Sequence, residues 1–206
     1  MAKLIAITGG SGAGKTTIAN ALMRRLAPNA VIIGEDDYYR CSSTIPDFDA
    51  ASFNFDEPAA KDDALLAQHL ARARRGEGFD KPRYDLSTHR RERAAERVTP
   101  PAFVIVEGIH LLAFPDLRNL FDLAVYIEAE EALRLGRRMI RDVETRARTP
   151  HSVFHQFFTY VRPMHDLHVA PQRSLADLVL VSSPEGGPGE AEAHATVIEA
   201  RLQALS

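Results

Sequence analysis

A glycine-rich segment between a short apolar run and a helical pattern constrains this chain more than any other feature. The segment, Gly9-Gly10-Ser11-Gly12-Ala13-Gly14-Lys15-Thr16, fits the pattern G-x-x-x-x-G-K-[ST]. Glycines let the backbone wrap closely around a polyphosphate, so that amide N–H groups and the N-terminus of the next helix face the anion. Lys15 can then reach the β- and γ-phosphates, and the Thr16 hydroxyl can ligate Mg²⁺. A chance glycine-rich turn is the alternative, but the strand–loop–helix context favours a site for a nucleoside triphosphate.

Short apolar runs alternate with segments of helical periodicity along most of the chain. We expect strands at residues 4–8, 30–33, 103–106, 123–127 and 178–181, helices at 15–26, 64–71, 130–142 and 151–168, and a terminal helix after a linker at 182–190. This alternation predicts an α/β fold with a doubly wound parallel sheet covered on both faces. Ligands bind beyond the carboxyl ends of such strands, and Gly9, Asp36 and Glu107 all follow predicted strands.

We expect a single domain over residues 1–206, with two less regular stretches. Residues 40–58 are polar and aromatic without a clear period, which is typical of a surface loop. Residues 79–99 are charged and contain Pro82, which favours an excursion from the domain rather than a core element.

Charge and composition exclude several classes of protein. Lys and Arg total 25 and Asp and Glu total 28, and the formal net charge of −3 argues against bulk binding of nucleic acid or membranes. The single cysteine, Cys41, leaves neither an internal disulfide nor a cysteine zinc cage and suits a reducing compartment. No apolar stretch approaches the ~18 residues that span a bilayer, and the N-terminus lacks a signal-peptide layout. We therefore expect a cytoplasmic protein.

A phosphate loop alone does not distinguish a kinase from a GTPase, a motor or a regulatory switch. The guanine-reading tetrapeptide N-K-x-D does not occur in the sequence, which argues against a GTPase. Asp36 follows the second strand, where a carboxylate can take the proton of an acceptor hydroxyl; a helix N-cap or turn is its alternative role. Glu107 ends a neighbouring strand, where an acidic metal ligand is expected, and a capping or loop carboxylate is its alternative.

Seven blocks of sequence resemble, in order, the uridine–cytidine kinase family within the wider uridine kinase and phosphoribulokinase group. The blocks are residues 9–17, 35–40, 54–58, 84–89, 106–109, 137–142 and 161–164, within a resemblance that runs from about residue 4 to residue 181. Only the phosphate loop is specific by itself, but the blocks occur together. The resemblance implies a P-loop kinase fold with a lid at about 137–150 and a nucleoside-binding excursion at about 77–99.

The resemblance implies transfer of a phosphoryl group from ATP, with Mg²⁺, to the 5′-hydroxyl of uridine or cytidine. Asp36 resembles the base of the family, and Lys15 and Arg141 complete the implied catalytic set. The implied ATP-binding residues are Gly9, Gly10, Ser11, Gly12, Ala13, Gly14, Lys15, Thr16, Thr17, Arg141 and Arg146, and the implied metal residues are Thr16, Asp36 and Glu107. Arg141 and Arg146 match lid arginines that close over the phosphates.

On the acceptor side, the implied substrate-binding residues are Asp36, Phe55, Asp56, Tyr84, His89, Arg138, Arg148 and Gln156. Asp56 resembles the carboxylate that accepts hydrogen bonds from both ribose hydroxyls, with an Asx turn before Pro58 as its alternative role. Phe55 and Tyr84 match the aromatic walls of the base pocket. His89 matches the residue at the base edge, where a neutral imidazole can donate or accept and so serve both pyrimidines. A solvated loop histidine is the alternative.

A solvated, salt-bridged helix face is the alternative for the lid arginines, and we expect it for Arg134 and Arg137. Three positions depart from the family pattern. Leu86 stands where an aromatic residue is frequent, Ala147 replaces a glycine between two arginines, and residues 182–184 (Ser-Ser-Pro) replace an Arg-Gly pair. The first two departures predict a looser base pocket and a stiffer lid hinge, and the third bears on adenine-side or subunit contacts.

Two rival functions remain beside the nucleoside kinase. One is a kinase of another small acceptor, such as a different riboside, a sugar phosphate or pantothenate, against which Asp56, Tyr84 and His89 argue. The other is a nucleotide-binding regulatory module without transfer activity, against which Asp36 and Lys15 argue. Members of the resembled family are commonly tetrameric, so the resemblance implies a homo-oligomer whose other partner is a small nucleoside.

Overall fold

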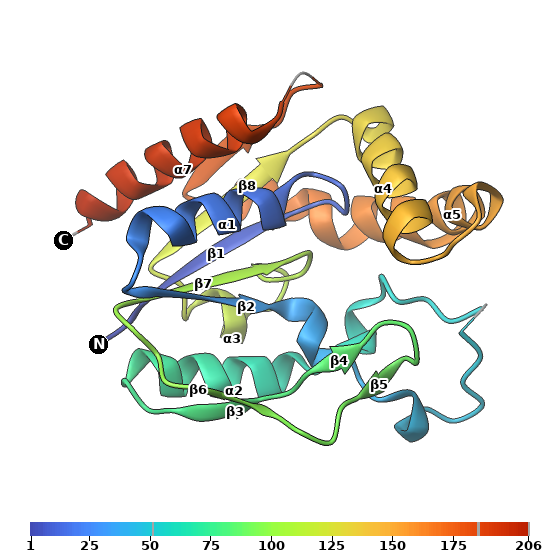
Figure 1. The fold of residues 1–206 in the computed structure, drawn as a ribbon, viewed down its shortest axis with the longest axis horizontal. Coiled ribbons are helices and arrows are strands. Elements are labelled where there is room, and N and C mark those ends of the chain that lie inside the picture. Colours follow the sequence, from blue (N-terminus) through green and yellow to red (C-terminus); the bar gives the residue numbers. More distant parts are fainter. Residues whose placement is uncertain (51, 185, 206) are drawn as a thin grey trace.

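A parallel sheet forms the middle of the molecule in the computed structural model, which describes residues 1–50, 52–184 and 186–205 (Figure 1). Its strands are β1 (Lys3–Gly9), β2 (Ala30–Gly34), β7 (Phe103–Gly108), β8 (Leu123–Glu128) and β9 (Leu178–Val181). They lie in the order β2-β7-β1-β8-β9 and every neighbouring pair is parallel. Each strand coincides with an apolar run of the sequence, because the inner strands of a covered parallel sheet are buried on both faces.

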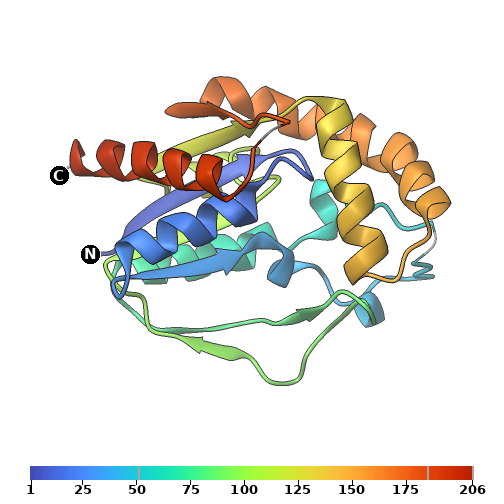
Figure 2. The same cartoon turned by 45° about the horizontal axis from the view of Figure 1, so that its top comes forward.

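Helices cover both faces of this sheet (Figures 1 and 2). Helices α1 (Lys15–Leu26) and α7 (Pro188–Gln203) pack together on one face, and α2 (Asp63–Arg74) and α3 (Pro115–Arg118) lie on the other. Alternate residues of β1 feed two apolar clusters: Leu4 joins the cluster under α2, and Ile5 joins the cluster under α1 and α7. The predicted doubly wound α/β class is confirmed.

Most of the remaining helical segments lie at or beyond the carboxyl ends of the strands, whereas the last 3₁₀ turn, Ala170–Leu175, contacts β1 and β8. Helices α4 (Glu131–Thr145) and α5 (Pro150–Gln156) lie at the opposite end of the molecule from both chain termini (Figure 1). The predicted helix at 151–168 is not one regular α-helix, because π-type turns at Phe157–Val161 and His165–Val169 flank α6 (Arg162–Met164). Pro163 has no N–H to donate to the preceding turn, which accounts for the loosened ladder. Short 3₁₀ turns cover Glu35–Tyr38, Ser42–Thr44, Pro58–Ala60 and Ala170–Leu175.

Residues 79–99 differ from the expected excursion. They form two small antiparallel pairs, β3 (Phe79–Lys81) with β6 (Glu96–Val98) and β4 (Tyr84–Asp85) with β5 (Arg90–Arg91). Phe79 and Val98 are buried in the same apolar cluster as α2, so the expectation that this stretch contributes no core element is wrong at its two ends. The charged residues between Phe79 and Val98 dominate the composition of this stretch, so the sequence did not indicate that these two residues are buried.

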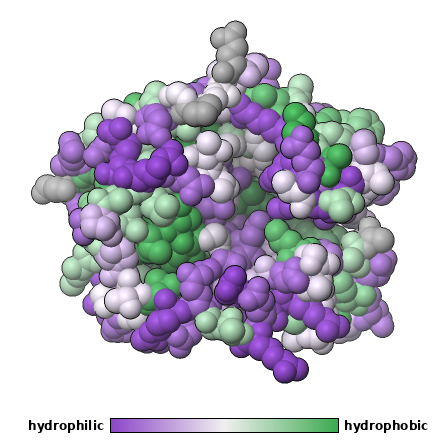
Figure 3. Space-filling model, viewed as in Figure 1, coloured by the Kyte–Doolittle hydropathy of each residue, from purple (hydrophilic) through white to green (hydrophobic). Residues whose placement is uncertain are grey.

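The surface seen in Figure 3 is mainly hydrophilic, and its hydrophobic side chains form separate patches. Among the described residues, helices long and apolar enough to cross a membrane are absent.

Candidate active site

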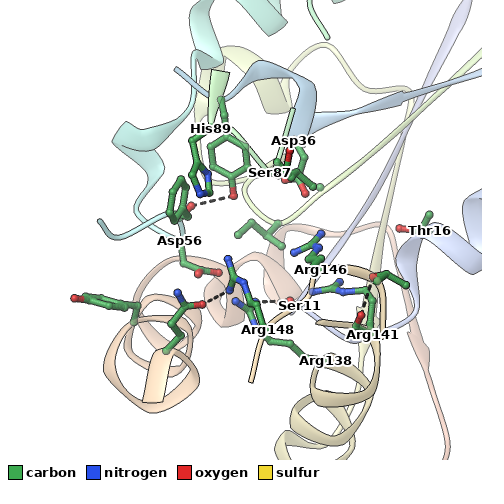
Figure 4. Close-up of a pocket in the computed structure, with 18 of the residues that line it drawn as sticks. Ser11, Thr16, Asp36, Asp56, Ser87, His89, Arg138, Arg141, Arg146 and Arg148 are labelled. Atoms are coloured by element: carbon green, nitrogen blue, oxygen red, sulfur yellow. Dashed lines mark hydrogen bonds between the residues drawn. The ribbon is translucent and has the colours of Figure 1, made fainter. Parts of the chain in front are cut away.

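A pocket of about 910 Å³ opens at the carboxyl edge of the sheet, between the phosphate loop, the turn after β2, the β4–β5 hairpin and helices α4 and α5 (Figure 4). It collects most of the predicted site residues: Ser11, Lys15, Thr16, Asp36, Phe55, Asp56, His89, Glu107, Arg138, Arg141, Arg146, Arg148 and Gln156. Figure 4 shows His89 and Asp36 on one side of this space and the lid arginines on the other. The parallel strands account for the gathering, since their carboxyl ends share one edge.

The phosphate loop folds as its sequence requires. Gly12 has a φ of +82°, and a Cβ built on it would lie 2.4 Å from the carbonyl oxygen of Arg134. Gly14, also left-handed with a φ of +98°, is the N-cap of α1. The loop closes over its own lysine, because the Lys15 ammonium is buried and donates to the Gly10 carbonyl at 3.0 Å. The helix N-terminus and this cation thus point into the same end of the pocket.

Lys15, Glu107 and Asp36 form the electrostatic centre of the pocket. Burial lowers the pKa of Lys15, and the nearby Glu107 and Asp36 carboxylates oppose that shift. Burial likewise raises the pKa of Glu107, against the influence of Lys15. Glu107 lies within β7, paired in register with Gly34 of β2 and Ile7 of β1, rather than at a helix cap.

Three oxygen-bearing side chains at this edge suit a divalent cation. Thr16, Asp36 and Glu107 line the same pocket. The described residues hold no group of three or more His, Cys, Asp or Glu side chains arranged for a metal. Mg²⁺ in nucleotide-handling enzymes typically relies on one or two carboxylates, waters and the phosphates of the substrate rather than an all-protein cage. The hydroxyl and two carboxylates therefore fit a metal that arrives with its nucleotide.

Asp36 lies in the 3₁₀ turn that follows β2, and its side chain is 52% exposed toward the pocket. The N-cap of that turn is Gly34, so the capping alternative for Asp36 is not what the structure shows. Desolvation inside the pocket favours the neutral form of the carboxyl group, but the Lys61 ammonium outweighs this and lowers the pKa of Asp36. The carboxylate is therefore ionised and available to an acceptor hydroxyl at neutral pH.

Lys61 is a site residue that the sequence analysis missed. It is 2% exposed and contacts Glu35 Oε2 at 2.7 Å and Asp36 Oδ1 at 3.1 Å. Glu35 is itself buried and accepts the backbone N–H groups of Ile109 and His110. The ion pair thus ties the turn carrying Asp36 to the segment before α2, and the hydrogen bonds of Glu35 tie it to the segment after β7.

The far end of the pocket is aromatic and contains Asp56. Asn54 Oδ1 accepts the Asp56 N–H at 3.1 Å, so the Asx turn considered for Asp56 belongs to Asn54. Phe55 and His89 stack with ring centroids 4.7 Å apart and an interplanar angle of 28°. Burial lowers the pKa of His89, which leaves its imidazole neutral near pH 7, and its left-handed backbone (φ 55°) aims it into the pocket rather than solvent.

Tyr84 has a different place from the one predicted. The wall of the pocket is formed by Tyr39, and Tyr84 packs behind it with ring centroids 5.2 Å apart. Leu86 does line the pocket and is 39% exposed, in keeping with a looser wall. Tyr39 lies three residues after Asp36 in the block 35–40, and the sequence analysis assigned a role only to Asp36 in that block.

The lid arginines gather along one side of the pocket. Arg138 donates to Ser11 Oγ at 2.9 Å, which places it against the phosphate loop although the resemblance implied a nucleoside contact. Arg148 hydrogen-bonds to Gln156 at the opposite side of the cluster. The solvated face expected for Arg134 is wrong, because this side chain is 3% exposed beneath the phosphate loop. Arg137 donates to Ser182 and to the carbonyl of Ser183 instead of joining a salt-bridged surface.

The two remaining departures are both accommodated. Ala147 takes a φ of 51°, the left-handed conformation that a glycine would adopt without strain. Ser182 and Ser183 are held by Glu190 at 3.0 and 2.8 Å. Ser182, with Gly14 and Thr17, lines a second cavity of about 220 Å³. The predicted loop residue Thr17 thus faces this second cavity rather than the main pocket.

Comparison with known proteins agrees with this geometry. The model of the phosphoribulokinase / uridine kinase family matches residues 4–186. A uridine kinase of Clostridium perfringens is 39% identical over 184 residues, covering 89% of this chain and 87% of that protein. A uridine kinase of Geobacillus kaustophilus is 40% identical over 185 residues, covering 89% and 86%. Among solved structures, the phosphoribulokinase from Rhodobacter spheroides superposes with a TM-score of 0.67 at 16% identity, over 93% of this chain and 74% of that one.

Proposed function

The chain belongs to the phosphoribulokinase / uridine kinase family and is a P-loop kinase of the uridine kinase type, and on that premise we propose that it phosphorylates uridine and cytidine at the 5′-hydroxyl, with ATP as donor. The observation that carries this proposal is the layout of the main pocket. Its phosphate-loop end contains Lys15 and Thr16, its aromatic end contains Asp56 and His89, and Asp36 lines the same pocket. A phosphate donor and a riboside with a flat base can thus bind in one pocket, on either side of the Asp36 carboxylate.

Asp36 accepts the proton of the 5′-hydroxyl in this proposal. Phosphoryl transfer proceeds through a loose transition state, in which positioning and charge stabilisation contribute more than strong basicity. An aspartate of lowered pKa is adequate under these conditions, because the proton moves late. Arg141 and Arg146 supply positive charge to the transferring group from the lid side.

Thr16, Asp36 and Glu107 are the residues that would hold Mg²⁺, which neutralises phosphate charge when bound. The chain's own contribution is to present the oxygen ligands at the edge where the phosphate loop ends. Burial deprives the Glu107 carboxylate of full hydration, and a cation that enters with the nucleotide would replace the missing water contacts.

Selectivity arises at the aromatic end. Asp56 presents two acceptor oxygens, which match the cis-diol of a ribose. The Phe55–His89 stack offers a flat apolar face to a pyrimidine. A neutral His89 ring can either donate or accept at the base edge, so that both uridine and cytidine are served.

The test is an assay of ADP release with and without each of several acceptors. Release should require uridine or cytidine and remain at background with ribulose 5-phosphate or pantothenate. Turnover of thymidine or a purine nucleoside at the rate of uridine would be consistent with the proposed phosphate site but would overturn the assignment of a pyrimidine riboside as the acceptor. If ADP is released without any acceptor, or if no ADP is released with any acceptor, the result would favour the regulatory module.

Asp56→Ala should reduce kcat/KM for uridine and narrow the preference for uridine over 2′-deoxyuridine. A site built to hydrogen-bond a hydroxyl can reject an analogue without it by up to ~10⁴-fold, and solvent access to this pocket reduces that ceiling. Steady-state kinetics with both substrates measure the ratio. Glu57→Ala is the matched control, since this neighbouring carboxylate contacts Asn54 rather than the pocket. A wild-type ratio in the Asp56 variant would return Asp56 to a structural role.

A further inference from the structure

One carboxylate behind the lid is completely buried among arginines. Asp142 lies in the last turns of α4 and is 0% exposed. Its Oδ1 atom lies 2.8 Å from Arg141 and 3.5 Å from Arg146, and its Oδ2 atom lies 3.5 Å from Arg138 and 3.8 Å from Arg148. All four arginines line the main pocket (Figure 4), so a single acidic group is shared by the entire basic side of that pocket.

The charge balance of this cluster requires the carboxylate. Four guanidinium groups lie within 4 Å of the oxygens of one fully buried carboxylate, and their like charges repel one another. Asp142 offsets one positive charge and leaves three facing the pocket. The cluster is thereby held together without its ligand, yet stays strongly basic toward a polyphosphate.

The main chain of the same residue fixes the turn that follows. The carbonyl oxygen of Asp142 accepts the N–H of Arg146 at 3.2 Å and the N–H of Arg148 at 3.1 Å. Between these two donors lies Ala147, in its left-handed conformation. Side chain and carbonyl together set the positions of the arginines on both sides of the helix end.

The two carboxylate oxygens are not equally engaged. Oδ1 accepts a hydrogen bond from Arg141 Nε, and its ion pair with Arg141 is the shortest of the cluster. Oδ2 and Arg138 Nε lack a hydrogen-bond partner among the described residues, although they are 3.5 Å apart. Arg138 and Arg148 therefore lie within ion-pair distance of Asp142, while their hydrogen bonds go to Ser11 and Gln156.

We propose that Asp142 is a positioning residue that assembles the four lid arginines before substrate arrives. It touches no reacting atom and acts through the guanidinium groups that do. The inference rests on the proposed function only in taking the anion to be the phosphates of ATP. The alternative is a purely structural ion pair that stabilises α4 and leaves the geometry of the arginines unchanged.

The first test uses the free protein. In ¹⁵N spectra of arginine side chains, the Nε–Hε signal of Arg141 should be sharp and slow to exchange with water, unlike that of the exposed Arg201. Asp142→Asn keeps the shape but removes the charge, and it should bring the Arg141 signal to the exchange rate of Arg201. Glu144→Gln, an exposed acid two residues along the same helix, should change neither signal.

The second test is kinetic. With the riboside that wild type turns over best, Asp142→Asn should lose about 10²-fold in kcat/KM, the scale of a small misplacement of positioning groups. Glu144→Gln should stay within threefold of wild type. A folded Asp142→Asn protein with protected Arg141 or with wild-type kcat/KM would overturn the proposal. If that variant does not fold, rapid exchange of Arg141 in the wild type would overturn it. Absence of turnover with every riboside would count against the proposed function, while the spectra would still decide on Asp142.

Discussion

Asp36→Asn is expected to lower kcat by about 10²-fold or more while leaving the fold and ATP binding in place, since this is the scale on which a general base contributes. The amide keeps the size of the carboxylate but cannot take a proton from the 5′-hydroxyl. It also weakens the contact with Lys61, so thermal unfolding should be measured alongside turnover.

Asp37→Asn provides the matched control for this variant. Asp37 is the next residue of the same turn and pairs with Lys81 rather than with Lys61. Its loss should reduce stability without a comparable loss of kcat. Near-normal turnover in Asp36→Asn, or equal losses in both variants, would remove Asp36 from the chemistry.

The sheet and the strand-end residues could be predicted because their signals are local. An apolar run followed by Gly9 or Glu107 places that residue at the carboxyl edge once the strands are parallel, and the pairing registers of β1, β2 and β7 agree with this placement. The two small strand pairs could not be predicted in the same way. Phe79 and Val98 are single buried residues in charged surroundings, and their burial depends on α2 and the sheet, far away in sequence.

Lys61 and Asp142 show two different reasons why site residues escape a sequence analysis. Lys61 finds its carboxylate partners 25 and 26 residues earlier in the chain, and nothing in its own neighbourhood signals that pairing. Asp142 did carry a signal, because Arg138 and Arg146 lie four residues before and after it on one helix face. A charged helix face has the same residue spacing in the sequence whether it lines a pocket or faces solvent, and only the fold distinguishes the two cases.

Lys15→Ala is expected to abolish measurable transfer, at least ~10³-fold below wild type, and to weaken ATP binding. A point charge that stabilises the transferring group contributes on this scale in a dry site, and the arginines of the lid approach from another side. Burial already disfavours the Lys15 cation in the free protein, so the phosphates of ATP are the partners that complete its surroundings.

Calorimetric titration with ATP and the ADP-release assay separate binding from transfer in this variant. Lys81→Ala is the control, since Lys81 is also a buried lysine but pairs with Asp37 and Glu96 away from the pocket. The free Gly10 carbonyl left by Lys15→Ala can accept water, so the loop should keep its fold and any loss be assigned to the missing charge. Retained transfer with wild-type ATP affinity would mean that the donor binds elsewhere, and the nucleoside end of the pocket would then need a different source of phosphate.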